Sequence, residues 1–158
     1  MTEQGHTLTI RDDDLSGPEI TQLLRGHRSA AVANSPPGAA HALDLAALKR
    51  PEVTVWSAWY GDQLAGCGGL REISKTHAEV KAMHTAASHV RKGVATTLLH
   101  HMMSIARERG YKRLSLETGK SEEFRPAREF YKRFDFLPCP PFGDYVDDGF
   151  SVCMTRVV

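Results

Sequence analysis

The stretch HVRKGVATTLL, residues 89–99, joins two cations and a glycine to the start of an apolar helical pattern. Arg91 and Lys92 lead directly into Gly93, after which Val94 and Leu98 recur at helical spacing. We therefore predict a helix that begins near Gly93 and follows a flexible, cationic turn. The first N–H groups of a helix have no intrahelical acceptor, and the helix dipole is positive there. The stretch is typical of a phosphate cradle, although a surface loop with two solvated charges would use the same residues.

Length and composition indicate a single domain over residues 1–158. Twenty Lys and Arg residues nearly balance 19 Asp and Glu residues, so we expect no nucleic-acid partner. We also expect no membrane partner, because the sequence has neither a long apolar run nor a signal-like start. The three cysteines are far apart and form no C-x-x-C, which favours a reduced, cytoplasmic setting over a disulfide framework.

The rest of the chain predicts strands and helices that alternate. In order, we expect a strand at 7–11, a helix from 18, a short helix at 41–49, a hairpin whose strands begin at 53 and 63, a strand at 78–85, the helix from 93 to 110, a strand at 112–118, a helix at 125–134, and an antiparallel pair at 136–139 and 151–157. The hairpin's second strand contains Gly66, Gly68 and Gly69, which weaken it unless another segment must come close to its backbone.

The strand at residues 78–85 leads directly into the cationic turn. Strict alternation predicts that Glu79, Lys81, Met83 and Thr85 share one face, and that Val80, Ala82 and His84 share the other. The order strand, helix, strand predicts a right-handed parallel βαβ unit. Ligands of such units bind at the carboxyl ends of the strands, so we expect the site beside residues 89–99.

Three motifs in this order resemble the GNAT superfamily of acyl-CoA-dependent N-acyltransferases: HVRKGVATTLL, then LSLET at 114–118, then AREFYKRFDF at 127–136. The family's phosphate motif is Gln or Arg, two residues, Gly, one residue, then Gly or Ala. Gly93 and Ala95 fit this motif, whereas Val90 occupies the Gln/Arg position. Because the cradle works chiefly through backbone N–H groups, Val90 removes a side-chain contact rather than the site.

The family's later pattern, Ala-x-x-x-Tyr-x-x-x-Gly-Phe, is present as Ala127, Tyr131 and Phe136, with Asp135 where Gly is usual. The chain is especially similar to small bacterial acetyltransferases that end in a P-F-x-x-Y segment, which here is PFGDY at 141–145. The resemblance implies an α/β fold of mixed α+β type. Its single domain would have a mixed central sheet that is splayed at its middle, with helices on both faces.

The resemblance also implies acetyl-CoA as the acyl donor, and no metal. The backbone N–H groups at the start of the helix would bind its pyrophosphate, assisted by two cations; the residues concerned are Arg91, Lys92, Gly93, Val94, Ala95 and Thr96. The pantetheine arm would lie along the strand that ends at Met83, His84 and Thr85.

Transfer to an amine in a ternary complex needs a base and an acid. A lysine-like amine with a pKa of about 10.4 is neutral in roughly one molecule per thousand at neutral pH, so a general base is useful. Glu117 is the first candidate, because it matches the Glu of an L-x-L-E segment in some GNAT N-terminal acetyltransferases; a structural carboxylate is the alternative. Glu79, acting through a water, is the second candidate. By the resemblance, Tyr131 protonates the departing thiolate; a core aromatic is the alternative.

The amine acceptor is left open among polyamines, amino acids, antibiotics, peptide N-termini and lysine side chains. Phe142 and Tyr145 are the expected acceptor contacts. The adjacent pair His100 and His101 is read as helix surface rather than as a metal site. Exposed strand edges are compatible with a homodimer. The alternative function is a non-catalytic acyl-CoA-binding module that regulates or pairs with another protein.

Overall fold

The centre of the protein is a seven-stranded mixed sheet with the strand order β1-β2-β3-β4-β5-β7-β6. The structure is a computed structural model that describes residues 7–33 and 45–158. Its elements are β1 (Leu8–Asp12), α1 (Pro18–Ala33), α2 (Leu45–Leu48), β2 (Val53–Tyr60), β3 (Gln63–Ser74), β4 (His77–Thr85), η1 (Ala87–His89), α3 (Val94–Glu108), β5 (Arg113–Gly119), η2 (Glu122–Phe124), α4 (Arg125–Arg133), β6 (Leu137–Cys139) and β7 (Ser151–Val157).

The strands and long helices predicted from the sequence are confirmed, with bounds that differ by a few residues. The short helix expected over 41–49 is present as α2, and its residues 41–44 lie outside the described residues. No helix in the described part of the chain has the length and apolar character needed to cross a membrane.

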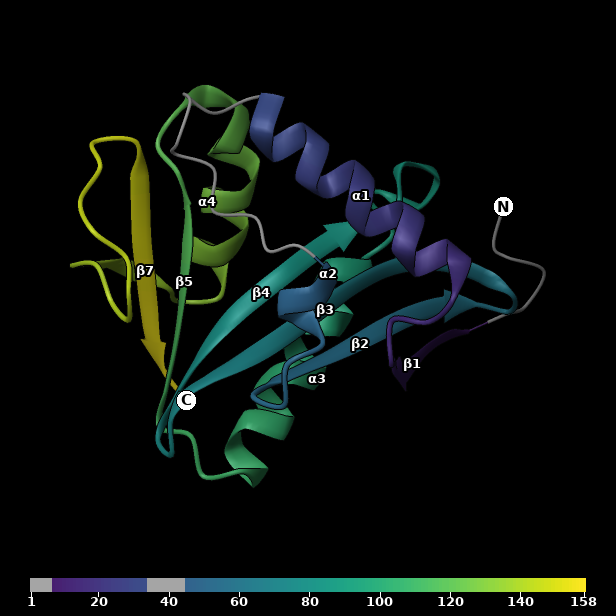
Figure 1. The fold of residues 1–158 in the computed structure, drawn as a ribbon, viewed down its shortest axis with the longest axis horizontal. Coiled ribbons are helices and arrows are strands. Elements are labelled where there is room, and N and C mark those ends of the chain that lie inside the picture. The colour runs from purple at the N-terminus through teal and green to yellow at the C-terminus, as the bar shows by residue number, and fades with distance from the viewer. Residues whose placement is uncertain (1–6, 34–44) are drawn as a thin grey trace.

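The sheet is antiparallel except where β4 meets β5. These two strands pair in parallel over only three residues each, from His77 with Arg113 to Glu79 with Ser115. β4 nevertheless continues to Thr85, so the two strands separate toward their carboxyl ends. Figure 1 shows them starting together and then diverging. The parallel βαβ unit and the splayed mixed sheet are therefore confirmed.

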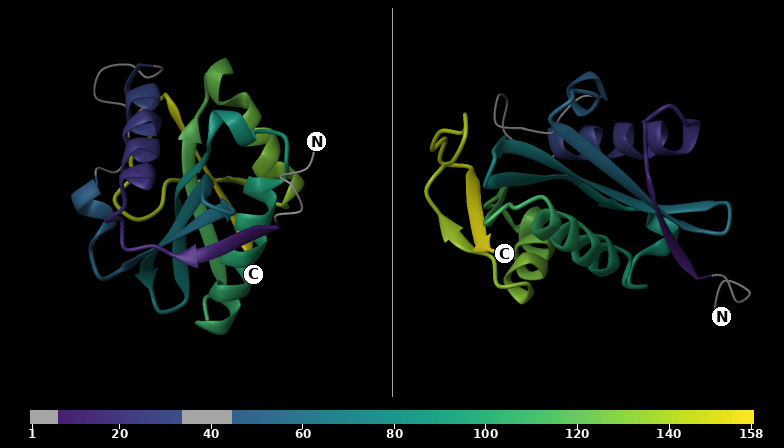
Figure 2. Two further views of the ribbon diagram at one scale, coloured as in Figure 1. Left: turned by 90° about the vertical axis from the view of Figure 1, so that its right-hand side faces the viewer. Right: turned by 90° about the horizontal axis from the view of Figure 1, so that it is seen from below.

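Helices cover both faces of the sheet (Figure 2, right). α3 and α4 cover one face, which we call the α3 face. Its core contains Leu98 and Met102 of α3, Leu114 of β5 and Tyr131 of α4. α1 covers the opposite face, the α1 face, where a second cluster includes Ile20 and other apolar side chains. A residue's face therefore decides which helices it can meet.

A β-bulge in β4 makes the predicted alternation wrong for the second half of the strand. Lys81 pairs with Gly69 and His84 with Cys67, so three steps along β4 oppose two along β3. Ala82 takes up the extra residue with φ at 56°. It packs in the α1-face cluster, whereas Met83 packs against the α3-face core. Beyond the bulge the two predicted faces are exchanged, because an extra residue inverts a period of two.

The glycines of β3 let β4 and α3 approach closely. A Cβ on Gly66 would lie 2.7 Å from the carbonyl oxygen of His84 and 2.8 Å from Cγ1 of Val94. A Cβ on Gly68 would meet the sulfur atoms of Met83 and Met102. Side chains at these positions would therefore push apart the elements that border the splayed end of the sheet.

Candidate active site

The turn before α3 is shaped by two residues in the left-handed conformation. After η1, Arg91 has φ at 64° and Gly93 has φ at 80°. A Cβ on Gly93 would meet nothing within 4 Å, so a side chain would fit there. Glycine is favoured at this position because of the left-handed backbone conformation. Turns of this kind aim successive N–H groups at one point and form anion-binding concavities.

The start of α3 has the features of a phosphate site. The first intrahelical bond runs from the N–H of Thr97 to the carbonyl of Gly93 at 3.0 Å. The geometry of the helix therefore leaves the N–H groups of Val94, Ala95 and Thr96 without an intrahelical acceptor. The first turn of the helix contains no acidic residue, and the preceding turn is exposed. An anion can therefore reach these donors at the positive end of the helix dipole.

The end of β4 provides a second strip of backbone next to this turn. Met83, His84 and Thr85 are half-buried and lie beyond the last β4–β5 pair. On the other side, His84 and Thr85 pair with β3. Burial lowers the pKa of His84, so its ring is neutral at pH 7. This strip borders the gap between β4 and β5, as expected for the residues predicted to hold the pantetheine arm.

Tyr131 lies on the α3 face. Its ring packs at 5.2 Å from that of Phe130 and at 5.5 Å from that of Phe136. Within residues 7–33 and 45–158 its hydroxyl has no hydrogen-bond partner. Burial raises the pKa of Tyr131 well above its usual value, so the phenol is protonated at neutral pH. The phenol therefore keeps its proton, and its hydroxyl is not committed to another described group.

Glu79 is held by a network that the sequence analysis missed. The side chain is 1% exposed, and its Oε1 accepts a hydrogen bond from Nε of Arg71 at 3.1 Å. Its Oε2 accepts from Nζ of Lys81 at 3.1 Å and from the hydroxyl of Tyr145 at 2.6 Å. One feature of the sequence could have predicted the pair of Arg71 and Glu79: these residues carry opposite charges and oppose each other across the β3–β4 hairpin.

The segment 140–150, between β6 and β7, brings both predicted acceptor contacts against β4. The hydroxyl of Tyr145 accepts a hydrogen bond from Nζ of Lys81 at 2.8 Å while it donates to Glu79. The ring of Phe142 lies 5.2 Å from that of Tyr145 and 5.8 Å from that of His77. Burial and the charge of Glu79 raise the pKa of Tyr145, so it is a neutral phenol.

Glu117 lies on β5, two residues past the last β4–β5 pair. It is half-buried and opposes Cys153 of β7. Its negative charge helps to raise the pKa of both Tyr145 and Cys153. Burial is the main cause for Cys153, whose pKa rises to about 11. The structure therefore brings Glu79, Glu117 and Tyr145 together on one face, with Tyr131 on the other.

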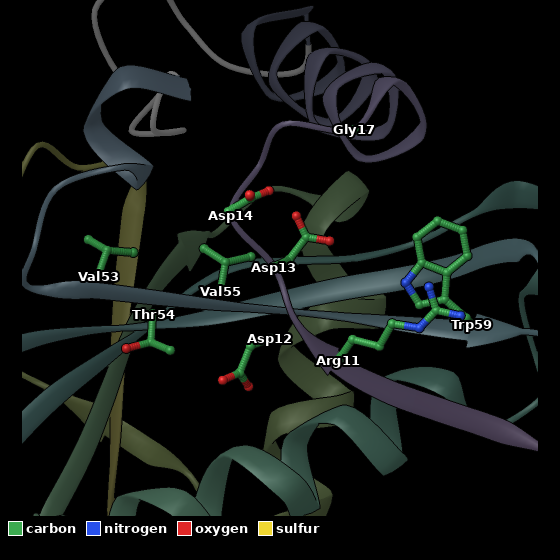
Figure 3. A pocket seen from close by; sticks show the side chains of 9 residues that line it. All are labelled: Arg11, Asp12, Asp13, Asp14, Gly17, Val53, Thr54, Val55 and Trp59. Carbon is green, nitrogen blue, oxygen red and sulfur yellow. The ribbon is translucent and has the colours of Figure 1, made fainter.

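A cavity of about 520 Å³ lies at the other end of the sheet, between β1, β2 and the start of α1 (Figure 3). None of the predicted site residues lines it. Asp13 accepts hydrogen bonds from the hydroxyl of Ser57 and the N–H of Leu15. Asp14 accepts a hydrogen bond from the N–H of Ser16. These carboxylates serve the turn into α1, so the cavity does not compete with the β4–β5 gap as the candidate site.

Comparisons with known proteins agree with this arrangement. Residues 19–136 match the acetyltransferase (GNAT) family. YsnE of Bacillus subtilis (strain 168) is 50% identical over 147 residues, which cover 93% of this chain and 97% of YsnE. YedL of Escherichia coli (strain K12) is 43% identical over 143 residues, 90% of each chain. Both are named uncharacterized N-acetyltransferases.

A Bacillus subtilis acetyltransferase, solved in complex with CoA, has the same fold. The TM-score is 0.71 at 18% identity, with 96% of this chain and 99% of that chain covered. At this identity the likeness concerns the fold alone, so the positions of individual site residues depend on the geometry described above.

Proposed function

Because this chain belongs to the GNAT family of acyl-CoA-dependent acyltransferases, we propose that it transfers the acetyl group of acetyl-CoA to a primary amine by direct attack in a ternary complex. One observation carries the proposal: β4 and β5 separate toward the turn that precedes α3, and the gap between them lies between Tyr131 on the α3 face and Glu117 on the α1 face. Donor and acceptor can therefore meet at the gap from opposite faces of the sheet.

Acetyl-CoA would bind along the splayed end of the sheet. The N–H groups of Val94, Ala95 and Thr96 would bind its pyrophosphate, with Gly93 shaping the turn and with Arg91 and Lys92 at the rim. The pantetheine arm would lie along Met83, His84 and Thr85. The CoA in the Bacillus subtilis acetyltransferase supports this cosubstrate. Val90 is 51% exposed, so the unusual residue there leaves the backbone of the turn in place.

Glu117 is the preferred base in this mechanism. Two cations and a phenol already bind the carboxylate of Glu79, and a proton placed there would remove the negative charge that pairs with both cations. In the step we propose, Glu117 takes a proton from the ammonium form of the acceptor, and the neutral nitrogen then attacks the thioester carbonyl carbon. The C–S bond breaks as Tyr131 gives its phenolic proton to the sulfur, and the nitrogen loses its second proton to the tyrosinate, which restores the phenol. The products are the N-acetylated acceptor and CoA with a free thiol.

The departure from the family pattern at Asp135 also agrees with an intact fold. Asp135 has φ at 67°, the left-handed conformation in which the family usually has glycine. Asp is one of the few other residues that tolerate this conformation. The substitution therefore keeps the backbone of this turn, so the absence of glycine does not by itself favour a non-catalytic module.

The test of the proposed function is CoA release from acetyl-CoA with a panel of primary amines. Tyr131→Phe should lower kcat by roughly 10²- to 10⁴-fold, the usual effect of removing a general acid, with the Kd for acetyl-CoA unchanged by calorimetry. Tyr111→Phe is the matched control, because its hydroxyl donates to Glu72 away from the gap. Equal turnover by wild type and Tyr131→Phe would remove Tyr131 from the mechanism. Acetyl-CoA binding without turnover on any amine would favour the non-catalytic module.

A further inference from the structure

The cluster around Glu79 pairs two cations with one buried carboxylate. Arg71 and Lys81 both pair with Glu79, at 3.1 Å in each case, so two cations share one carboxylate. The side chain of Lys81 is only 9% exposed, and that of Arg71 is 26% exposed. A further anion would stabilise partly buried cations that share one countercharge.

Both cations also have N–H donors that bind no acceptor among the described residues. An ammonium group has three N–H donors, and Lys81 directs two of them at Glu79 and Tyr145. The third has no acceptor among the described residues. Arg71 uses only Nε in the described structure, and its Nη2 lies 3.5 Å from where a Cβ on Gly143 would be, under the segment 140–150. The cluster is thus preorganised to receive an oxygen anion.

The position of Lys81 and Arg71 in the sheet indicates which anion they can bind. Lys81 lies before the bulge, next to Val80 of the α3-face core, and so faces the α1 side, whereas α3 and Tyr131 lie on the other. The pyrophosphate site at the start of α3 is therefore on the donor side of the sheet. Glu117 shares the α1 face with Lys81, and both act on the same hydroxyl of Tyr145. The anion near Lys81 would accordingly belong to the acceptor.

We infer that Lys81 and Arg71 bind a carboxylate of the acceptor, so that the substrate is an amino acid, with its amine directed toward Glu117. The inference rests on the proposed function, since it takes Glu117 as the group that receives the amine proton. Lys81 would be a specificity-determining residue, and Tyr145 would hold its ammonium in place through the hydrogen bond at 2.8 Å. Glu79 would position both cations rather than act on the substrate.

The experiment compares each of the twenty amino acids with its α-carboxamide, which keeps the amine and removes the negative charge. CoA release should show kcat/KM at least about tenfold higher for the preferred acid than for its amide, mainly through KM. Lys81→Gln should lower this acid-to-amide ratio by roughly 10- to 100-fold, the worth of a charge-assisted hydrogen bond. Lys81→Arg should restore most of the ratio. Lys75→Gln, which removes an exposed charge before β4 begins, is the control and should leave the ratio as it is in wild type.

Several outcomes would overturn the inference. Amides used as well as the acids, or a Lys81→Gln variant that slows both alike, would remove the carboxylate site. The wild-type comparison alone decides this if Lys81→Gln fails to fold, which thermal melts would reveal. Turnover of polyamines or aminoglycosides but of no amino acid would also overturn it while leaving the acetyltransferase intact. Absence of turnover with every amine would instead overturn the proposed function.

Discussion

At the scale of single residues, Glu117 and Glu79 present the same carboxyl group in two settings. Glu79 is buried and accepts from three donors, whereas Glu117 is half-buried on β5 beside the gap. We expect Glu117→Gln to lower kcat by roughly 10²- to 10³-fold while the free energy of unfolding stays within about 1 kcal/mol of wild type. Steady-state CoA release and urea unfolding on the same preparation check both parts.

The matched variant at the second carboxylate should behave in the opposite way. Glu79→Gln keeps the shape of the side chain but leaves Arg71 and Lys81 without a countercharge. We expect a loss of about 3 kcal/mol in the free energy of unfolding, because uncompensated charge remains in a nearly buried site. If Glu79→Gln instead loses turnover at full stability, Glu79 is the base and the assignment of Glu117 is wrong.

Site residues that belong to a short sequence motif could be predicted from the sequence. Site residues that meet only because the chain folds could not. The Gly93 turn is marked by glycine and by the helix that follows it. Tyr145 meets Glu79 across 66 positions of the chain, and no spacing encodes that contact. Arg71 and Lys81 are not among the predicted site residues, because their burial depends on the segment 140–150 that covers them.

At the scale of elements, β4 depends on the absence of a side chain at one position of β3. We expect Gly66→Ala to destabilise the protein by about 1–3 kcal/mol, since the new Cβ would lie 2.7 Å from the backbone oxygen of His84. The Kd for acetyl-CoA should rise as well, because the displaced segment ends at Thr85. Urea unfolding and calorimetry measure the two effects.

Gly26 provides the control for the same chemical change. It lies within α1, and a Cβ there would meet nothing within 4 Å. Gly26→Ala should therefore stabilise the protein by about 0.5–1 kcal/mol through helix propensity. If the Gly66→Ala protein is as stable as the Gly26→Ala protein, then β3 and β4 can accommodate a Cβ at residue 66, and the prediction is wrong.

Element existence and order could be predicted because apolar periodicity and turn residues are local signals. The bulge could not, because Ala82 adopts φ at 56° without glycine, asparagine or aspartate to mark it. The alternation of β4 looked regular on paper, and only the register with β3 reveals the extra residue. The error concerned the strand that borders the gap between β4 and β5, and it exchanged the faces on which Ala82 and Met83 lie.

At the scale of the whole molecule, the sheet consists of two halves with a short seam. β1–β4 form one half and β5, β7 and β6 the other, and three parallel pairs of residues join them. Side chains strengthen this seam on the α1 face. Nε2 of His77 on β4 lies 2.7 Å from the hydroxyl of Ser115 on β5, which in turn contacts Thr155 of β7 at 2.9 Å. A change of charge at His77 therefore acts on the junction of the two halves.

Burial, followed by the positive charge of Arg113, lowers the pKa of His77 in the folded protein. The unfolded chain, with a His pKa of about 6.5, then binds more protons than the folded protein at mildly acidic pH. Because stability rises with pH wherever the unfolded state binds more protons, the contribution is fully present above about pH 6.5. It is lost as the pH falls from there through the lower pKa of the folded state.

We therefore expect the free energy of unfolding in urea to decrease between pH 7.5 and pH 5.5, a range that avoids most carboxylate titration. His77→Gln should flatten this dependence, because glutamine can still hydrogen-bond Ser115 but takes up no proton. The pKa of His84 is also lowered by burial, so part of the slope should persist in the variant. A slope that is the same in His77→Gln and wild type would place the proton uptake elsewhere than the seam. A slope of opposite sign would mean that the folded protein binds the proton more tightly than the unfolded chain, contrary to the lowered pKa of His77.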